Sequence, residues 1–550
     1  MPSLPSKPYI VQKYGGTSIG KLLPTITSSI IPSYLPTSRL AIICSARSST
    51  LKAQGTTSLL LDAVQLATSQ PWESGRVERV IAGICEDHVR AAQEAVAGRS
   101  AELLSEVRGE IERDCEGLRG LLRATAMLGE ISERTTDRVL AVGETLACRI
   151  VAAALRSEDT RELIEPCVKG LDAAVVILDD IVQQAYGDSP SHDLHQRFKD
   201  HPSAFLRGLT DAIALKVAAS PAQIPVITGF FGAMPGSLIQ SVSRGYSDLC
   251  AALCAIALSA SELQIWKEVD GIFTADPRKI KAARLLATVT TDEAAELTYY
   301  GSEVIHPLTI EQIDDAGIPL RLKNVMNPQG DGTIIFPSTR SSSAGSGRST
   351  PERRVAGGSE SPSVSDKTSF MVANGYYGPN QCRRTPTAVT VKESVKVLNI
   401  RSHGTTSPQA FLCLVSNTLE QHDIVVDLIS SSQQMLSLAV CAQKQKKLNR
   451  AIEKLESIGQ VSVLENMSIV SVIGHKMRNM VGVGAEIFSA LATARVNIYL
   501  ISQGASEINI SFVVSAQDAQ LAMQVVHTNV MKIPLHAERE TAFAKGPWLY

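Results

Sequence analysis

Between Tyr9 and Phe336, short runs of β-branched residues alternate with longer amphipathic segments. The runs predict strands at Tyr9–Gln12, Leu40–Cys44, Ile224–Thr228, Leu263–Trp266 and Ile318–Leu322. The amphipathic segments predict helices that include Ala101–Leu122, Asp137–Leu155 and Ser247–Ser259. Alternating strands and helices are typical of an α/β domain with a mainly parallel sheet, whose ligands bind at the carboxyl ends of the strands. We predict such a domain over residues 9–337, after a tail of residues 1–8.

This alternation stops at Ser338. The following stretch, STRSSSAGSGRSTPERRVAGGSESPSVSD, is rich in Ser, Gly and Pro and has no apolar period. It cannot bury enough apolar surface to offset the entropy lost on ordering. Residues 338–385 are therefore predicted to form a flexible linker.

An internal repeat follows the linker. The recurring segments are Leu428–Ser430 with Leu500–Ser502, and Leu436–Val440 with Ile510–Val514. Each copy begins with a predicted strand, Val395–Ile400 or Ser468–Ile473, followed by helix, strand, strand and helix. This order is that of a βαββαβ unit. We predict one copy at residues 386–466, the other at 467–535, and a tail at 536–550. Tandem units of this kind usually pair and bind small ligands at their seam; two purely structural domains are the alternative.

Composition narrows the class of protein. A chain of 550 residues is too long for one core, since single cores stop growing near ~250–300 residues. Its net charge of −2 gives no basic excess for nucleic acid or a membrane surface. The longest apolar run, Leu249–Ala260, is shorter than the ~20 residues of a spanning helix. The residues before the first predicted strand contain no apolar run of the length expected for a signal peptide. The ten cysteines have no framework spacing. We expect a cytoplasmic protein without nucleic-acid, membrane or structural-metal partners.

The first candidate for chemistry follows the first predicted strand and is Lys13-Tyr14-Gly15-Gly16-Thr17-Ser18. Paired glycines allow a phosphate to approach the backbone closely. The stretch Gly15–Lys21 matches the start of a P-loop, but Leu22 stands where Ser or Thr would hold magnesium. The pattern therefore disfavours a P-loop NTPase and favours Lys13 as the candidate lysine.

Two further segments are candidates for ligand binding, one before a predicted helix and one after a predicted strand. Ser243–Asp248 leads into a helix, where Ser247 or Asp248 could be the cap and Arg244 offers a fork that suits a carboxylate. A capped loop is the alternative. Trp266–Arg278 follows a strand and mixes cations, carboxylates and aromatic residues, as nucleotide loops often do; a solvated surface loop is the alternative.

A fourth segment is Gly143-Glu144, before the amphipathic run Thr145–Leu155. A glutamate near the start of a helix is usually a favourable contact with the helix dipole and nothing more.

Together these segments resemble the aspartate kinases (aspartokinases) of the amino-acid kinase superfamily, and the fungal ones most closely. The matching blocks are KYGGTS, CSARSS…GTTS, ISERTTDRVLAVGE, SRGYSDLCAAL, WKEVDGIFTADPRKI, YYGSEVIHPLTIEQ and LISQGASEINIS. The resemblance implies a three-layer α/β/α kinase domain followed by two ACT domains. It also implies ATP-dependent phosphorylation of L-aspartate to 4-phospho-L-aspartate, with Mg²⁺, as the first step towards threonine, methionine and isoleucine.

The resemblance assigns roles by position. Lys13 and Asp248 would be catalytic, with phosphate bound by Gly15, Gly16, Thr17 and Ser18. Substrate would contact Ser45, Thr57, Glu144, Arg244 and Ser247. The nucleotide would contact Lys267, Glu268, Phe273, Asp276 and Arg278. Arg244 would pair with the α-carboxylate of aspartate and Glu144 with its ammonium group. Because a side-chain carboxylate with a pKa of about 4 is already ionised at pH 7, no general base is needed, and His306 is expected to be structural.

Two positions depart from the family pattern. Ser243 stands where relatives usually have Gly, and Glu303 where some bacterial relatives carry a nucleotide-contacting lysine, so Glu303 receives no such role. Ser243 is the only support for one alternative, a catalytically impaired amino-acid sensor, against which the intact Lys13 and Asp248 argue. Another is a kinase of glutamate or of a nucleoside monophosphate.

The ACT pair implies feedback control, which in fungal members is typically exerted by threonine. Candidate effector contacts are Ser402–Ser407, Asp427, Asn497, Ile498 and Gln503. The ACT domains also imply a homo-oligomer.

Overall fold

The computed structural model describes residues 7–48, 55–69, 74–96, 100–157, 171–187, 191–220, 222–232, 234, 242, 245–301, 305–337, 385–403, 407–441, 445–475, 477, 480–504 and 508–533. It divides into two compact units. The first joins Met1–Gly271 to Ile305–Thr339, and the second joins Ile272–Val304 to Arg340–Tyr550. Except for Thr385, the predicted linker lies outside the described residues.

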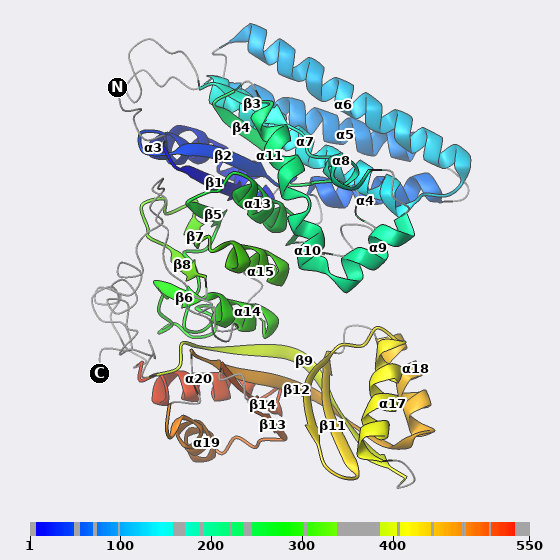
Figure 1. Ribbon diagram of the computed structural model, residues 1–550, viewed down its shortest axis with the longest axis vertical. Helices are drawn as coiled ribbons and strands as arrows, with labels where there is room; N and C mark the ends of the chain where they lie inside the picture. Colours follow the sequence, from blue (N-terminus) through cyan, green and yellow to red (C-terminus); the bar gives the residue numbers. More distant parts are fainter. Residues whose placement is uncertain are drawn as a thin grey trace, which may run out of the picture. The chain divides into compact units, whose positions relative to one another are not determined.

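A mainly parallel sheet forms the centre of the first unit (Figure 1). In spatial order its strands are β3 (Ala173–Val176), β4 (Ile224–Thr228), β2 (Arg39–Cys44), β1 (Tyr9–Tyr14), β5 (Glu262–Lys267), β7 (Leu320–Asn324) and β8 (Thr333–Phe336). Neighbours pair in parallel from β3 to β7, and the β7–β8 pair is antiparallel. All five predicted strands are present, so the predicted α/β class is confirmed.

Helices surround this sheet. They are α1 (Gly16–Lys21), α2 (Leu23–Thr25), a π-helical turn (Ile26–Ile30), α3 (Ile31–Tyr34), α4 (Thr56–Thr68), α5 (Ser74–Val96), α6 (Ala101–Leu128), α7 (Glu133–Ser157), α8 (Ile181–Tyr186), α9 (Ser191–Asp200), α10 (Pro202–Arg207), α11 (Thr210–Ala218), α13 (Tyr246–Ala257) and α15 (Pro307–Ala316). Helix α6 extends to Leu128, beyond the predicted end at Leu122. The prediction stopped early because Met127 and Leu128 are exposed and do not continue the buried apolar period. Gly129, with φ of 72°, ends it. Helices α5 and α6 lie side by side in Figure 1 and share an apolar core with α4 and α7.

Two features of these helices correct the sequence analysis. Glu144 lies in the interior of α7, which begins at Glu133, so it makes no contact of the kind expected near a helix start. The cap of α13 is the backbone of Gly245, and neither Ser247 nor Asp248 caps the helix. Both side chains are buried in its first turn instead.

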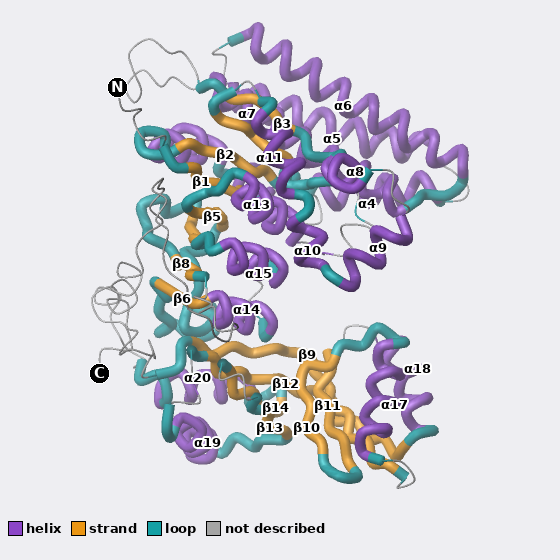
Figure 2. Tube along the Cα trace, in the orientation of Figure 1, coloured by secondary structure: helices purple, strands orange, loops and turns teal. Residues whose placement is uncertain are grey.

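The second unit contains a six-stranded antiparallel sheet with helices, coloured by type in Figure 2. Its strands in spatial order are β10 (Val426–Ser431), β11 (Met435–Cys441), β9 (Ala388–Ser402), β12 (Gly459–Ile473), β14 (Asn509–Ser515) and β13 (Leu500–Ser502). Its repeat helices are α17 (Pro408–Glu420), α18 (Gln445–Glu456), α19 (Val483–Thr493) and α20 (Ala519–Asn529). The predicted order of strands and helices is confirmed in both copies.

The copies are interlocked through the two long strands, which the repeat alone did not reveal. The later half of β9 pairs with the early half of β12 in the first copy, while Ala388–Lys392 pairs with Ile469–Ile473 in the second. The register shifts between these halves, where Ser394 and Asn466 have left-handed φ values of 60° and 57°. The second copy is therefore completed by a segment that precedes the first.

Residues Ile272–Val304 also belong to this unit. They contain a hairpin-like turn, β6 (Thr288–Thr290) and α14 (Thr291–Tyr299). Ala275 and Ile280 enter the same apolar core as Ile487 and Phe512 of the second copy. The predicted domain boundaries follow the chain in order and stay predictions, since the compact units combine segments that are separate in sequence.

Candidate active site

The predicted catalytic residues meet at one edge of the parallel sheet. Lys13 is near the end of β1, Ser45 follows β2, Gly229 follows β4, and Lys267 ends β5. Because these strands are parallel, their carboxyl ends lie at the same edge. The first turn of α13 brings Asp248 to the same place.

Three charged side chains form the centre of this edge. The Lys13 Nζ lies 2.6 Å from Asp248 Oδ1, and Lys267 Nζ lies 3.7 Å from Asp248 Oδ2. Burial alone would raise the pKa of Asp248, but the charges of Lys13 and Lys267 outweigh burial and hold that pKa below its usual value. Burial lowers the pKa of Lys267, Asp248 opposes this, and Lys13 adds to it. The cluster therefore has two cations on one ionised carboxylate, which suits an incoming anion.

Glu144 is a buried carboxylate beside this cluster. It is fully buried, and neither oxygen makes a hydrogen bond of normal geometry to a described residue. Burial raises its pKa to about 8, although the nearby Tyr246 hydroxyl and the Lys13 charge lower it. Such a group is costly unless a ligand supplies the missing partner.

The backbone packs closely beside Glu144, and the sequence analysis missed the glycine that permits this close approach. A Cβ on Gly229 would lie 2.7 Å from Ser247 Cβ and 3.4 Å from Glu144 Oε1. The Ser45 hydroxyl donates to Ser247 Oγ at 2.9 Å in the same region. The run Thr-Gly-Phe-Phe-Gly directly after β4 was the signal that could have identified Gly229.

The glycine-rich segment is held tightly against the loop after β2. A Cβ on Gly16 would lie 2.0 Å from the Ala46 carbonyl oxygen, so the position requires glycine. Gly15 precedes α1 in an extended conformation, and Thr17 is half-buried. The Ser18 hydroxyl donates to Glu268 Oε1 at 2.6 Å, so it is already engaged by a residue of the predicted nucleotide loop.

The other predicted residues are placed less closely. Thr57 is half-buried in the first turn of α4. Ser243, Arg244 and Glu303 lie outside the described residues. Phe273, Asp276 and Arg278 belong to the second unit, whereas Lys267 and Glu268 belong to the first, so the predicted nucleotide loop is divided between the units. Asp276 accepts hydrogen bonds from the backbone and the guanidinium group of Arg278.

His306 has a structural role, as expected. Its Nδ1 accepts from the Leu308 N–H at 3.2 Å and so caps α15. A Cβ on Gly245 would lie 2.6 Å from the Cβ of His306, so His306 leaves no room for a side chain there. Burial lowers the pKa of His306 against the opposing charge of Asp248, which keeps the imidazole neutral.

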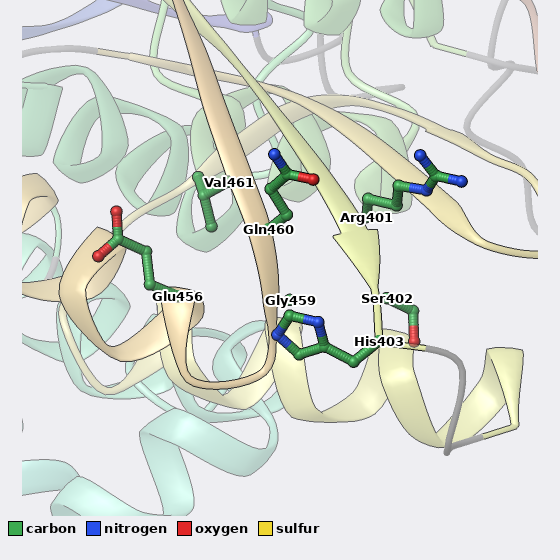
Figure 3. A pocket seen from close by; sticks show the side chains of 7 residues that line it. All are labelled: Arg401, Ser402, His403, Glu456, Gly459, Gln460 and Val461. Atoms are coloured by element: carbon green, nitrogen blue, oxygen red, sulfur yellow. The ribbon is translucent and has the colours of Figure 1, made fainter.

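The effector candidates are spread over the second unit. Asp427 on β10 is buried and accepts from Lys392 Nζ at 2.7 Å. Asn497 and Ile498 precede β13, and Gln503 follows it. An open cavity of about 500 Å³ lies where the end of β9 meets the start of β12 (Figure 3). Its lining residues are Arg401, Ser402, His403, Glu456, Gly459, Gln460 and Val461.

Of the effector candidates, only Ser402 and His403 of the Ser402–Ser407 segment border this cavity. Thr405 and its two neighbours lie outside the described residues. Among the described effector candidates, this cavity therefore brings together Ser402 and His403.

Comparison with known proteins identifies the family. The amino acid kinase family matches residues 8–324, and an ACT domain matches residues 470–530. The aspartokinase of Schizosaccharomyces pombe is 39% identical over 551 residues, covering 99% of this chain and 98% of that one. The aspartokinase of Candida albicans is 41% identical over 533 residues, covering 95% and 90%. This chain belongs to the aspartokinase family. It is thus an enzyme of the kinase class.

Solved aspartokinases share the fold. E. coli aspartokinase III in complex with aspartate and ADP has a TM-score of 0.64 and 24% identity, covering 95% of this chain and 99% of that one. The Clostridium acetobutylicum aspartate kinase has a TM-score of 0.65 and 20% identity, covering 95% and 100%. No helix in the described part of this aspartokinase is long and apolar enough to cross a membrane.

Proposed function

We propose that this aspartokinase transfers the γ-phosphoryl group of MgATP to the side-chain carboxylate of L-aspartate, which gives 4-phospho-L-aspartate and ADP. The family relationship supports the reaction, and one observation in the structure carries the choice of an amino-acid substrate. That observation is the buried and unsatisfied carboxylate of Glu144.

Glu144 is suited to bind an ammonium group. A substrate ammonium would supply the hydrogen bonds that the two carboxylate oxygens lack and would favour the ionised form of Glu144. Gly229 approaches Glu144 closely because it has no side chain, and the hydroxyls of Ser45 and Ser247 meet in the same region. Arg244 is proposed to bind the α-carboxylate, and Thr57 to complete the aspartate site. A substrate amine placed here leaves the distal carboxylate to face the lysine cluster.

Catalysis is proposed to rest on charge and alignment. The attacking carboxylate is ionised at neutral pH, so the difficulty is to bring two anions together. Lys13 and Lys267 reduce this repulsion and stabilise the charge that spreads over the transferring phosphoryl group. Asp248 holds both lysines in place. Magnesium enters with the nucleotide and neutralises its phosphates.

The remaining assignments extend the proposal. The backbone of Gly15–Ser18 is proposed to line the phosphates, and Lys267, Glu268, Phe273, Asp276 and Arg278 to contact the nucleotide. The cytoplasm is the proposed compartment, and the pathway to threonine, methionine and isoleucine the proposed context.

A coupled assay of ADP release tests the substrate. We expect turnover with aspartate and trapping of the product by hydroxylamine as a hydroxamate. Activity with glutamate should be on the order of a hundredfold lower, because one extra methylene changes selectivity about 10–200-fold. Turnover with glutamate alone would show a different amino-acid kinase. No turnover with any of these substrates, in a folded protein that binds threonine, would show an impaired sensor instead.

Threonine is the proposed effector, bound by the ACT copies through Ser402–Ser407, Asp427, Asn497, Ile498 and Gln503. An E. coli aspartokinase III of the same fold has been solved with lysine and aspartate, with a TM-score of 0.65 and 24% identity. Calorimetry with threonine, lysine and methionine distinguishes the effectors, and an absence of heat with threonine would contradict the proposal. We also propose a homo-oligomer, which light scattering of the purified chain tests.

A further inference from the structure

The turn that carries Phe273 and Asp276 is built onto the second ACT copy. Thr274 lies between these two residues, and its carbonyl oxygen accepts from the Val389 N–H of β9 at 2.9 Å. Its own N–H donates to the Arg284 carbonyl at 2.9 Å. Ala275, the next residue, is buried in the apolar core of this copy. A segment expected to bind the nucleotide thus takes its backbone conformation from the regulatory unit.

Two buried hydrogen bonds of the Thr274 hydroxyl hold this turn in place. Thr274 is fully buried, and its hydroxyl oxygen accepts from the Arg284 N–H at 2.9 Å. Its hydroxyl hydrogen is left to reach His527 Nε2, which is also 2.9 Å away. His527 lies on α20 and is fully buried.

The protonation state of His527 agrees with this direction of the bond. Burial, with a smaller contribution from the charge of Arg284, lowers the pKa of His527 to about 4, so the imidazole is neutral at pH 7. Its Nδ1 has no hydrogen-bond partner among the described residues. With Thr274 donating, Nε2 is the acceptor and Nδ1 carries the proton.

We infer that Thr274 and His527 are positioning residues for the nucleotide, and that helix α20 of the second ACT copy thereby sets the affinity of the kinase for MgATP. This rests on the proposed function, which assigns Phe273, Asp276 and Arg278 to the nucleotide. Neither positioning residue is proposed to touch it. The hydrogen bond acts by holding the turn between Phe273 and Asp276 in one conformation.

The location of the bond predicts a selective effect. Ser45, Glu144 and Ser247, which are proposed to bind aspartate, all lie in the first unit, whereas Thr274 and His527 lie in the second. Loss of the Thr274 hydroxyl leaves the Arg284 N–H and His527 Nε2 without this partner. The turn then relaxes, which weakens nucleotide binding and leaves the aspartate site as it was.

Steady-state kinetics of the full-length enzyme test this inference with two matched pairs. Thr274→Val removes the hydroxyl at constant shape, and Thr274→Ser keeps it. His527→Leu removes the acceptor, and His527→Gln retains one. Val and Leu variants should raise the KM for MgATP on the order of tenfold, the equivalent of one buried hydrogen bond, with the KM for aspartate within about twofold of wild type. The Ser and Gln variants should stay near wild type.

Two controls separate positioning from general damage. The double variant Thr274→Val, His527→Leu should raise the KM for MgATP no further than Thr274→Val alone, because that substitution already removes the bond to His527. Glu393→Gln breaks an exposed ion pair with Lys279 on the same turn and should change neither KM.

The outcomes are distinct. An unchanged KM for MgATP in Thr274→Val, or equal rises for MgATP and aspartate, would overturn the inference while aspartate phosphorylation by wild type upholds the proposed function. If Thr274→Val does not fold, the His527 pair decides the question alone. A wild-type enzyme that does not phosphorylate aspartate would overturn both.

Discussion

Glu144 and Glu293 are equally hidden from solvent, yet the regions around them are built in opposite ways. Glu293, in the first turn of α14, accepts from the Thr290 N–H at 2.8 Å and the Thr290 hydroxyl at 3.0 Å. It also accepts from the His475 N–H at 3.0 Å and from the Thr387 hydroxyl. Glu144, in the interior of α7, has no hydrogen bond of normal geometry among the described residues.

The difference separates a structural carboxylate from a functional one. Burying a carboxylate is tolerated when donors surround it, and Glu293 uses them to fasten α14 to the ACT sheet. The burial of Glu144 without donors is costly to the unliganded fold, which supports its proposed role in binding a substrate ammonium group. Substitutions in the region of Glu144 should therefore impair binding or turnover, whereas substitutions near Glu293 should impair stability.

The largest effect is expected for Lys13→Ala. Removing this cation leaves the approach of two anions less screened, so kcat should fall on the order of a thousandfold or more. The melting temperature should change little, because Lys267 still faces Asp248. A coupled kinase assay with a thermal melt checks both quantities. Near-normal turnover would remove Lys13 from the proposed mechanism.

Glu144→Gln should weaken aspartate binding on the order of a hundredfold and yet stabilise the unliganded protein. The pKa of Glu144 is about 8 when folded, against 4.5 for the free side chain. The wild type is therefore most stable below pH 4.5 with respect to this group, and loses on the order of 4 kcal/mol as pH rises to 8. The variant lacks this dependence. Thermal melts at pH 8, with and without aspartate, measure it.

Two results would contradict the contrast at Glu144. One is a variant less stable than wild type at pH 8 without aspartate. The other is a variant whose melting temperature aspartate raises as much as that of wild type.

Glu293→Gln should show the opposite behaviour. The amide would direct an N–H at groups that are themselves donors, which should cost about 2–3 kcal/mol of unfolding free energy. The KM for aspartate should stay within about twofold at temperatures where the variant is folded. Urea unfolding measures the loss of unfolding free energy. Steady-state kinetics at a temperature where the variant is folded measure the KM for aspartate. A raised KM for aspartate without loss of stability would erase the distinction between the two glutamates.

The smallest expected effect concerns His527. Its pKa is about 4 when folded and 6.5 in the free side chain, so its contribution is complete above pH 6.5 and is lost as pH falls towards 4. Unfolding free energy should fall by about 2 kcal/mol from pH 7 to pH 5 through this group. In His527→Gln the dependence should be flatter by that amount. Equal pH dependence in urea melts of wild type and variant would show that folding does not shift the pKa of His527.

The sequence predicted the sheet and much of the site because both depend on local signals. Strand periodicity and the segments after strands indicated Lys13 and Lys267, whereas Ser45 was assigned only through the family resemblance; the structure places all three at one edge. Gly229 was missed because its role comes from the close approach of Ser247, which is distant in sequence. The environment of Glu144 was missed for the same reason, since hydrogen bonds that are absent leave no mark on a periodic pattern.

The same limit applies to the second unit. Its repeat predicted two copies, but nothing local indicates that Ala388–Lys392 completes the later copy. The composition of Ile272–Val304 also gives no sign that this segment packs into the core of the second ACT copy. Both features are long-range pairings between surfaces that only folding brings together.

The shared strands β9 and β12 limit how this regulatory unit can be exchanged between proteins. A recombination point between the copies would leave one with a half-strand and the other without its edge partner. Transplanting the pair alone would also leave its core without Ala275 and Ile280. A chimeric aspartokinase must therefore take both ACT copies and Ile272–Val304 from the same parent. Effector specificity should be transferred only when all of these segments are exchanged together.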